Sequence, residues 1–313
     1  DMQEFISNQL SAQGYYEIMN NSLTAQSYYE GCETYPEANC VHVMNPLSSD
    51  LCLMRQTLLF GGLETATRNI NHKNPNLRMY EFGNVYHFNP EASNEEVALA
   101  PYSEHTALGI WLTGENHGDS WNDKARKLNF YDLKATVENI FRRLGIAERD
   151  LVAEEFKNDV FAPGIAYKNR GGKLIAELGI ITAKQHKKTH CTQVVYFAEL
   201  NWNAVCKMAA KAKTKFADLP KTLPVRRDLA LLVDGDVTYA DIKRVVEQSE
   251  RHLLRGVNLF DVYEGKNLEA GKKSYAISVT LQDDVKTLQD KQIDAVMNKI
   301  IANLEKQVGA KLR

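Results

Sequence analysis

The sequence predicts an α+β protein with two domains, and three observations lead to this interpretation. Apolar and polar residues alternate in runs such as Leu77–Phe88 and Thr106–Leu112, a pattern typical of antiparallel strands, while helical spacing occurs between such runs. The 313 residues, 44% hydrophobic and 25% charged, are sufficient to bury two cores. A Lys- and Ala-rich segment at residues 207–215 indicates a linker, so we expect domains at residues 1–206 and 216–313.

The first predicted domain combines helices with an antiparallel sheet. Met2–Gln13 has helical spacing, and Ser22 and Thr24 suit the start of a new helix after a strand at Tyr15–Leu23. Asp132 is the expected N-cap of a helix that Gly145 ends. Further predicted strands are Ile165–Tyr167 and Lys173–Ile181, which flank a turn at Asn169–Gly172, and Tyr196–Leu200.

A helix is also predicted at Thr57–Asn71, where one apolar stripe recurs at spacings of three and four residues. Gly61 and Gly62 lie beside the stripe, and two adjacent glycines lower helix propensity by about 1 kcal/mol each. Their presence therefore indicates close approach of another backbone. The stripe is open to two interpretations, a face packed on the domain's own core or a contact with a partner helix; its members are Leu59, Leu63, Ala66 and Ile70.

The second predicted domain has the order β-α-β-β-α-β, the ferredoxin-like arrangement of two helices on one face of a four-stranded sheet. Thr238 and Asp241 form a capping-box-like start for its first helix. The other face of such a sheet is open, and in the predicted strand Val257–Tyr263 the side chains of Asp261 and Tyr263 share one face. The remaining elements are strands at Arg227–Val233, Tyr275–Leu281 and Ala310–Arg313, and a helix from Thr287 or Asp290 through Leu304.

The net charge of the chain, -2, does not itself point to a nucleic acid, a membrane surface or an acidic ligand. The charge is unevenly distributed, however. Residues 213–313 carry 18 basic and 15 acidic side chains, a net charge of +3, whereas residues 1–212 carry 20 and 25, a net charge of -5. The smaller domain is therefore the better candidate for contact with a polyanion.

The cysteines and histidines give little indication of a metal or disulfide framework. The five cysteines are odd in number and form no Cys-x-x-Cys pair, which favours a reducing, cytoplasmic location. His186 and His190 have helical metal spacing, but the surrounding basic segment lacks a carboxylate, so a solvated turn or helix end is the favoured interpretation and no metal site is predicted. No apolar run is long enough to span a membrane.

Several separate stretches of the chain together resemble the β subunit of bacterial phenylalanyl-tRNA synthetase. The resemblance implies a module similar to the class II synthetase catalytic fold, followed by a ferredoxin-fold anticodon-binding domain. Because the chain begins Asp-Met-Gln-Glu-Phe, we expect a C-terminal fragment whose other domains lie upstream. The stretches are NPLSSDLCLMRQTLL at Asn45–Leu59, LRMYEFGNVYHF at Leu77–Phe88, and LPVRRDLALLV, VNLFDVYEGKNLEAGKKSYAISVTLQD and TLQDKQIDAV in the C-terminal part.

The larger domain is expected to be catalytically silent, so we predict no catalytic residue in it. A working class II site needs an Arg-x-Glu strand motif, in which both side chains share one face. Here Arg78 and Glu81 are three residues apart and should point to opposite faces, so we expect structural roles for them. Phe197–Val205 also lacks the glycines and the arginine that a phosphate-binding segment requires. By the resemblance, ATP and Mg²⁺ are used by the holoenzyme and no cofactor binds this fragment.

The resemblance implies an assembly role for the larger domain. The helix at Thr57–Asn71 corresponds to the class II dimerisation helix, which in this family joins α and β subunits in an (αβ)2 tetramer. On that basis the predicted subunit-interface residues are Leu59, Gly62, Leu63, Ala66 and Ile70.

The resemblance also implies tRNA(Phe) recognition by the smaller domain. Asp261 and Tyr263 match the family motif Asp-x-Tyr-Glu-Gly, in which the ring can stack on an unpaired base and the carboxylate can accept from a guanine, the first base of a GAA anticodon. Ala230 and Ser274 match further positions near that base. Four basic residues are predicted phosphate contacts by charge alone, with solvated strand ends as the alternative; they are Arg226, Arg227, Lys272 and Lys273.

The sequence thus predicts a non-catalytic part of a phenylalanine-tRNA ligase β subunit that scaffolds the α subunit and binds the anticodon. Two alternatives stay open. The chain could be an independent class II-like ligase with an unusual site, or an assembly module without RNA contact.

Overall fold

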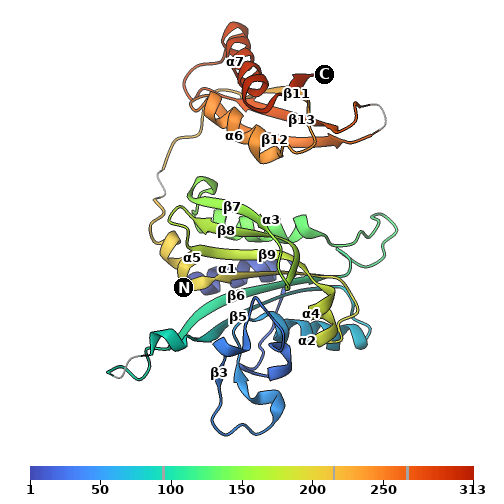
Figure 1. Cartoon of the computed structure of the whole chain (residues 1–313). Helices are drawn as coiled ribbons and strands as arrows, with labels where there is room; N and C mark the ends of the chain where they lie inside the picture. Colours follow the sequence, from blue (N-terminus) through green and yellow to red (C-terminus); the bar gives the residue numbers. More distant parts are fainter. Residues whose placement is uncertain (94–95, 214–215, 266–267) are drawn as a thin grey trace. The chain divides into compact units, whose positions relative to one another are not determined.

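The computed structural model describes residues 1–93, 96–213, 216–265 and 268–313. The chain divides into two compact units, Asp1–Thr214 and Lys215–Arg313, each with its own core (Figure 1). Both units combine antiparallel strands with helices, as the alternating patterns predict.

A seven-stranded sheet forms the centre of the first unit, with strand order β1-β5-β6-β10-β9-β8-β7. All neighbours are antiparallel except β1 and β5, which are parallel. The long pair β5 and β6 is joined without any register shift from Leu77 to Phe88. The strands are β1 (Tyr16–Glu17), β5 (Leu77–Phe88), β6 (Tyr102–Thr113), β7 (Leu151–Phe156), β8 (Phe161–Asn169), β9 (Leu174–Ile181) and β10 (Val195–Asn201).

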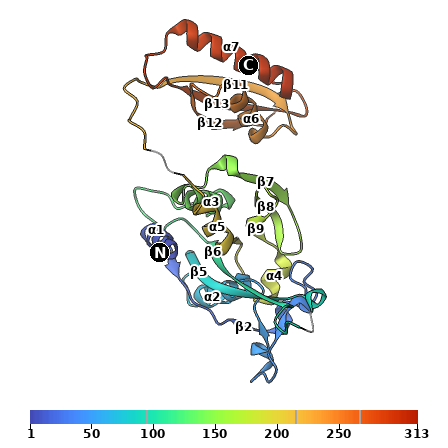
Figure 2. The ribbon, with the colours of Figure 1, turned by 90° about the vertical axis from the view of Figure 1, so that its left-hand side faces the viewer.

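The two faces of this sheet carry separate cores. Figure 2 shows the ribbons of the helices that lie around the sheet. Successive residues of β6 alternate between them, because Leu108 and Ile110 join the first core while Ala107 and Trp111 join the second. Helices α1 (Met2–Ala12), α3 (Phe130–Arg143) and α5 (Trp202–Ala209) contribute to the first core. The second core is covered by α2 (Leu59–Asn71), α4 (Ala183–Lys188) and a small sheet of β2 (Leu23–Thr24), β4 (Leu53–Met54) and β3 (Val41–His42).

Helix α2 uses its apolar stripe within the chain. Leu59, Leu63 and Ala66 have no exposed surface and pack in the second core, which Ile70 also contacts. A Cβ at Gly62 would lie 2.0 Å from the Trp111 indole. The group that packs closely against this glycine is therefore the Trp111 side chain, and not the backbone of another helix. This face of α2 therefore covers the chain's own sheet, the first of the two interpretations, and the interface role of Leu59, Gly62, Leu63 and Ala66 stays a prediction.

Other boundaries also differ from the sequence prediction; the strand predicted at Tyr15–Leu23, for example, is limited to Tyr16–Glu17. No α-helix starts at Ser22 or Thr24; only a short 3₁₀ turn, Gln26–Tyr28, follows β2. The N-cap of α3 is Asn129, and Asp132 completes a capping box by accepting from the Asn129 backbone N–H. Helix α5 extends to Ala209 and so occupies the start of the predicted linker, because its first turns bury Trp202, Ala204 and Val205.

The second unit is the predicted ferredoxin-like fold, with strand order β12-β13-β11-β14 and all neighbours antiparallel. Both helices pack on one face, where their apolar side chains meet Leu231, Ile277 and Val279. The predicted capping box of Thr238 and Asp241 begins the first helix. The elements are β11 (Val225–Asp234), α6 (Tyr239–Ser249), β12 (Leu254–Tyr263), β13 (Lys272–Leu281), α7 (Asp290–Val308) and β14 (Lys311–Leu312).

Candidate nucleic-acid interface

The face of the second sheet that the helices leave open has a floor of small side chains. On β13, Tyr275 and Ile277 enter the core, so Ser274 and Ala276, which alternate with them, point to the open face. Ala230 of β11 lies directly opposite Ala276 and therefore shares that face. Since these central side chains are short, larger groups on the outer strands can extend over them.

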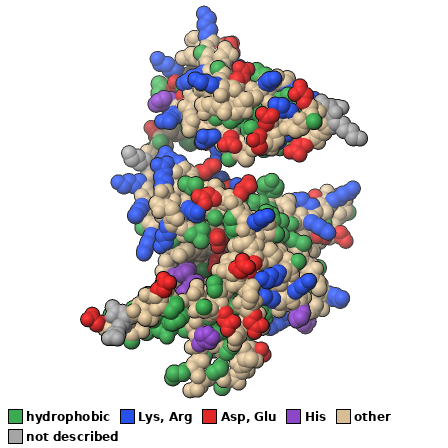
Figure 3. Space-filling model, viewed as in Figure 1, with side chains coloured by type: hydrophobic (Ala, Val, Ile, Leu, Met, Phe, Trp, Pro, Cys, Tyr) green, Lys and Arg blue, Asp and Glu red, His purple; other side chains and the backbone are tan. Residues whose placement is uncertain are grey.

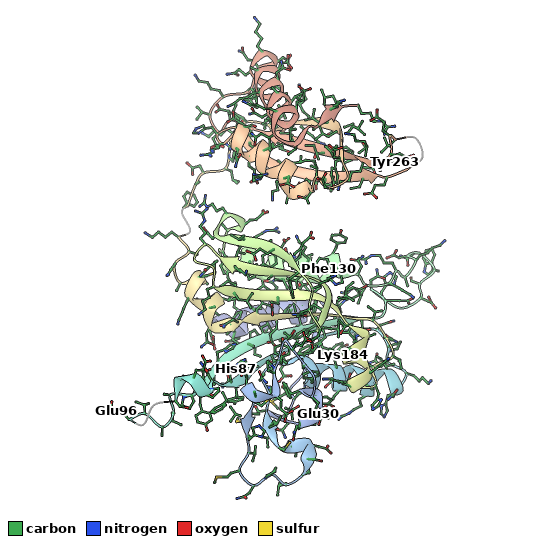
Figure 4. All side chains as sticks on the ribbon, viewed as in Figure 1. Glu30, His87, Glu96, Phe130, Lys184 and Tyr263 are labelled. Atoms are coloured by element: carbon green, nitrogen blue, oxygen red, sulfur yellow. The ribbon has the colours of Figure 1, made fainter. Side chains whose placement is uncertain are left out.

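Asp261 and Tyr263 border this floor from the edge strand β12. Asp261 lies opposite Ala276, and Tyr263 lies opposite Ser274 at the end of the strand (Figure 4). The Tyr263 side chain is 37% exposed. The structure thus brings together the four residues predicted near the first anticodon base: Asp261, Tyr263, Ala230 and Ser274.

The Tyr263 ring is positioned by two neighbours. A Cβ added at Gly265 would come within 2.6 Å of the tyrosine Oη, so only a glycine lets the ring lie against the backbone there. From the opposite edge of the sheet, the Cζ atom of Arg313 lies 5.8 Å from the ring centroid. At this separation the guanidinium attracts the face of the ring and holds a positive charge beside it.

A β-bulge sets which residues of β12 face outward. Leu259 pairs with Ile277 and Asp261 with Ala276, so Phe260 is an extra residue between two successive pairs. The bulge allows Leu259 to pack on the core while Asp261 and Tyr263 stay on the open face. Phe260 is 49% exposed and lies beneath Arg226, whose Cζ is 5.3 Å from the ring centroid.

The four predicted phosphate contacts separate into two pairs. Arg226 and Lys272 belong to the open face, but each is paired with an acid: Arg226 with Asp228 at 2.8 Å, and Lys272 with Asp234 at 2.6 Å. The hydrogen bond to Asp234 raises the pKa of Lys272. On the face of this unit that Figure 3 shows, basic and acidic side chains are interspersed.

Arg227 and Lys273 belong to the helix face. Arg227 lies opposite the buried Val279 and approaches Asp290 of α7 at 3.9 Å. The Lys273 ammonium lies 5.0 Å from the centroid of the Tyr275 ring, which packs in the core. These two side chains are therefore directed away from Asp261 and Tyr263.

Two members of the open face, Arg313 and Phe260, were not identified from the sequence. Arg313 belongs to the predicted last strand, and pairing of that strand with β11 could have indicated its position. The Arg313 N–H donates to the carbonyl of Ala230 at 3.0 Å. Phe260 had no comparable signal, since a bulge shifts the two-residue period that a sequence pattern assumes.

In the first unit, Arg78 and Glu81 have the structural roles that their spacing predicts. Glu81 is buried and pairs with Arg55, also buried, at 2.7 Å. The same carboxylate accepts from Asn20 Nδ2 at 2.7 Å. Arg78 points to the other face of β5 and donates to the carbonyl of Asn116 at 3.0 Å. Both charged groups are thus engaged in holding loops to the sheet.

The described residues include no group of three or more His, Cys, Asp and Glu side chains arranged for a metal ion. His186, in α4, is partly buried, and burial lowers the pKa of its ring. The cysteines Cys32, Cys40, Cys52, Cys191 and Cys206 are free thiols. Among the residues that the structure describes, no helix has the length and apolar composition needed to cross a membrane.

The chain is similar in sequence to beta chains of phenylalanyl-tRNA synthetases. The family model for the phenylalanyl tRNA synthetase beta chain CLM domain matches residues 1–202, and that for the ferredoxin-fold anticodon binding domain matches residues 220–313. The phenylalanine–tRNA ligase beta subunit of Bacteroides fragilis is 48% identical over 312 residues, 100% of this chain and 38% of that protein. The Porphyromonas gingivalis subunit is 46% identical over 99% of this chain and 38% of its own length.

Among solved structures, a pyrrolysyl tRNA synthetase from Desulfitobacterium hafniense covers 69% of this chain and 72% of its own, with a TM-score of 0.48 and 13% identity. The chain spans about 38% of the length of the Bacteroides and Porphyromonas relatives. Because the first family model covers more than half of the sequence, the chain belongs to the phenylalanyl-tRNA synthetase beta chain family.

Proposed function

We propose that this chain is the part of a phenylalanine–tRNA ligase β subunit that binds the anticodon of tRNA(Phe) and helps to assemble the holoenzyme. One observation carries the proposal. Tyr263, Arg313 and Asp261 surround a floor of small side chains on the open sheet face of a domain that matches an anticodon-binding family.

The open face suits an unpaired base. A base stacks on the Tyr263 ring at the small-residue floor, where Arg313 adds a positive charge. The Asp261 carboxylate then accepts hydrogen bonds from the Watson–Crick edge of a guanine, whose N1–H and exocyclic amine are donors. Arg226 and Lys272 lie on the same face and contact the phosphates once the RNA competes with their paired acids.

Catalysis is assigned to another subunit in this proposal. Arg78 and Glu81 are both committed to contacts within the chain, and Glu81 is 1% exposed. Neither is available to bind ATP or an amino acid. The holoenzyme would use ATP and Mg²⁺ at the α subunit, in the cytoplasm, where the free thiols of this chain stay reduced.

The α subunit would meet the outward side of α2. The inward stripe is buried, whereas Glu64 and Arg68 are exposed on the opposite side of the helix. This assignment keeps the predicted role of the helix in an (αβ)2 tetramer but moves the contact to different residues. Ile70 is half-buried at the edge of the stripe, whereas the other four predicted interface residues are buried.

Two measurements test the proposal against its alternatives. Affinity of the chain for tRNA(Phe) should fall as salt rises, because phosphate contacts release counterions; no measurable affinity at low salt would favour an assembly module without RNA contact. Phenylalanine-dependent ATP–pyrophosphate exchange should require added α subunit. Exchange by the chain alone would favour an independent ligase.

A further inference from the structure

The first unit contains a cavity of about 180 Å³ on the sheet face that α2 covers. Its polar lining comes from β5, β6, β9 and β10 and from the loops before α2. Figure 4 shows His87, one of the lining residues, on β5. The proposed tRNA and subunit contacts use none of these side chains, which are Tyr35, Gln56, His87, His105, Glu177 and Glu199.

Two carboxyl groups lie side by side in this cavity. Glu177 and Glu199 are directly paired across β9 and β10, which places their side chains on the same face, with Cβ atoms about 5 Å apart. Glu199 Oε2 accepts from the Leu58 N–H at 2.7 Å and from Thr57 Oγ1 at 2.8 Å. Glu177 has no hydrogen-bond or ion-pair partner among the described residues.

A third oxygen acceptor belongs to Gln56, which is 2% exposed. Its Nε2 donates to the Pro36 carbonyl and to Cys40 Sγ, both at 2.8 Å, and its Oε1 has no partner among the described residues. The lining is thus rich in unpaired acceptors, which a ligand with several donors would satisfy.

Two histidine rings from β5 and β6 also line the cavity. The rings of His87 and His105 are stacked, with centroids 5.6 Å apart and an interplanar angle of 11°. Burial lowers the pKa of both histidines, so both rings are neutral near pH 7. Neutral, planar rings offer a surface against which a planar cation can stack.

We propose that this cavity binds a small, planar organic cation with several N–H donors, of the guanidinium or amidinium class. A guanidinium fork matches paired carboxylate oxygens in geometry and charge. The volume also fits, because a cavity of about 150 Å³ accommodates a benzene ring. A metal ion fits poorly, since the described residues offer no group of three suitable ligands.

The net charge of the cavity becomes less negative as the pH falls. Burial raises the pKa of Glu177 and raises that of Glu199 to about 7, so lowering the pH from 8 to 6 removes negative charge. The same change moves His87 and His105 towards their charged forms. The other ionisable groups whose charges act on these side chains are Arg55, Lys168, Lys173, Tyr29 and Tyr35. Cation binding should therefore weaken as the pH falls.

Calorimetric titration of the whole chain with methylguanidinium tests the proposal, with neutral methylurea as the matched ligand. We expect binding at pH 8 that weakens about tenfold at pH 6 and about tenfold in Glu177→Gln, the scale of one charge-assisted hydrogen bond. Glu155→Gln, which removes an exposed carboxylate from β7, should bind as the parent chain does. A thermal melt checks that each variant is folded.

A second titration with Nα-acetyl-arginine amide distinguishes a free ligand from an arginine side chain of another polypeptide. Binding of both probes supports a free cation, and binding of the arginine derivative alone supports the same chemistry presented by a polypeptide. Equal affinities for methylguanidinium and methylurea, an unchanged affinity in Glu177→Gln, or no binding of either cation would overturn the proposal.

Discussion

Arg313, which follows the edge strand β14, meets Tyr263 at the end of the other edge strand, β12, with the guanidinium carbon 5.8 Å from the centre of the ring. The contact spans the two central strands and is possible because Ala230, Ser274 and Ala276 are short. It joins the last residue of the chain to the Asp-x-Tyr-Glu-Gly motif. A single base-sized surface results from residues that are far apart in sequence.

Replacing Tyr263 with Ala should weaken binding of a tRNA(Phe) anticodon stem-loop by about 1–3 kcal/mol, because one stacked base is lost. Tyr263→Phe keeps the ring and should bind within a few-fold of the parent chain. Fluorescence anisotropy with labelled RNA measures both affinities. Equal affinity of the folded Ala variant and the parent would exclude Tyr263 from the interface.

Replacing Arg313 with Ala should also weaken stem-loop binding and should lower the slope of log affinity against log salt by about one. The loss of slope reports one fewer phosphate neutralised, and an unchanged slope with reduced affinity would instead assign Arg313 to positioning the Tyr263 ring. Arg251→Ala is a suitable control, because it removes an exposed arginine outside the strands. Its effect on affinity and on slope should be smaller.

Much of the second unit could be predicted from the sequence because its local signals agree. The Thr238–Asp241 capping box and the alternation in Tyr275–Leu281 each specify one element, and both are present. The bulge at Phe260 was not predictable, since it depends on which register lets Leu259 reach the core. The contact of Arg313 with Tyr263 likewise depends on strand order and not on local sequence.

In the first unit, the strands were easier to predict than the use of the α2 face. An apolar stripe has the same spacing whether it packs on the chain's own sheet or on another helix. Only the sheet topology shows that Leu63 and Ala66 are buried against it. The cavity near Glu177 and Glu199 could not be predicted from the sequence either, because it depends on cross-strand pairing between β9 and β10.

Gly62→Ala tests how α2 packs. The new Cβ would overlap the Trp111 ring, which has no exposed surface, so we expect a loss of about 1–3 kcal/mol in the free energy of unfolding. Gly118→Ala introduces the same methyl group where no atom lies within 4 Å. Urea unfolding should show little change in that control. A Gly62 variant as stable as the parent would contradict the packing described here.

Arg55→Ala should destabilise the chain by about 3–5 kcal/mol, because it leaves the Glu81 carboxylate buried without its partner. Lys168→Ala breaks a more exposed pair with Glu154 and should cost about 1 kcal/mol or less. Chemical denaturation measures both losses. Similar losses of stability in the two variants would mean that the buried pair stabilises the fold no more than the exposed pair does.

Glu199 should make stability depend on pH. Burial raises the pKa of Glu199 from 4.5 to about 7 in the folded chain, so the folded state favours the protonated carboxyl group. Its contribution to the free energy of unfolding is therefore complete below pH 4.5 and is lost as the pH rises through 7. The free energy of unfolding, relative to Glu199→Gln, should fall by about 2–4 kcal/mol between pH 4.5 and pH 8. Denaturant unfolding at several pH values measures this difference. A difference that is constant with pH, or that grows, would contradict the assignment.

The most direct test of the anticodon-binding proposal compares two stem-loops that differ only in the first anticodon base, guanine or adenine, for the parent chain and for Asp261→Asn. Adenine lacks the donors that the carboxylate accepts from, so the parent should prefer guanine by about 1–3 kcal/mol, and the variant should lose most of that preference. Equal affinities in the parent, or an unchanged preference in the variant, would contradict recognition of the anticodon by this face.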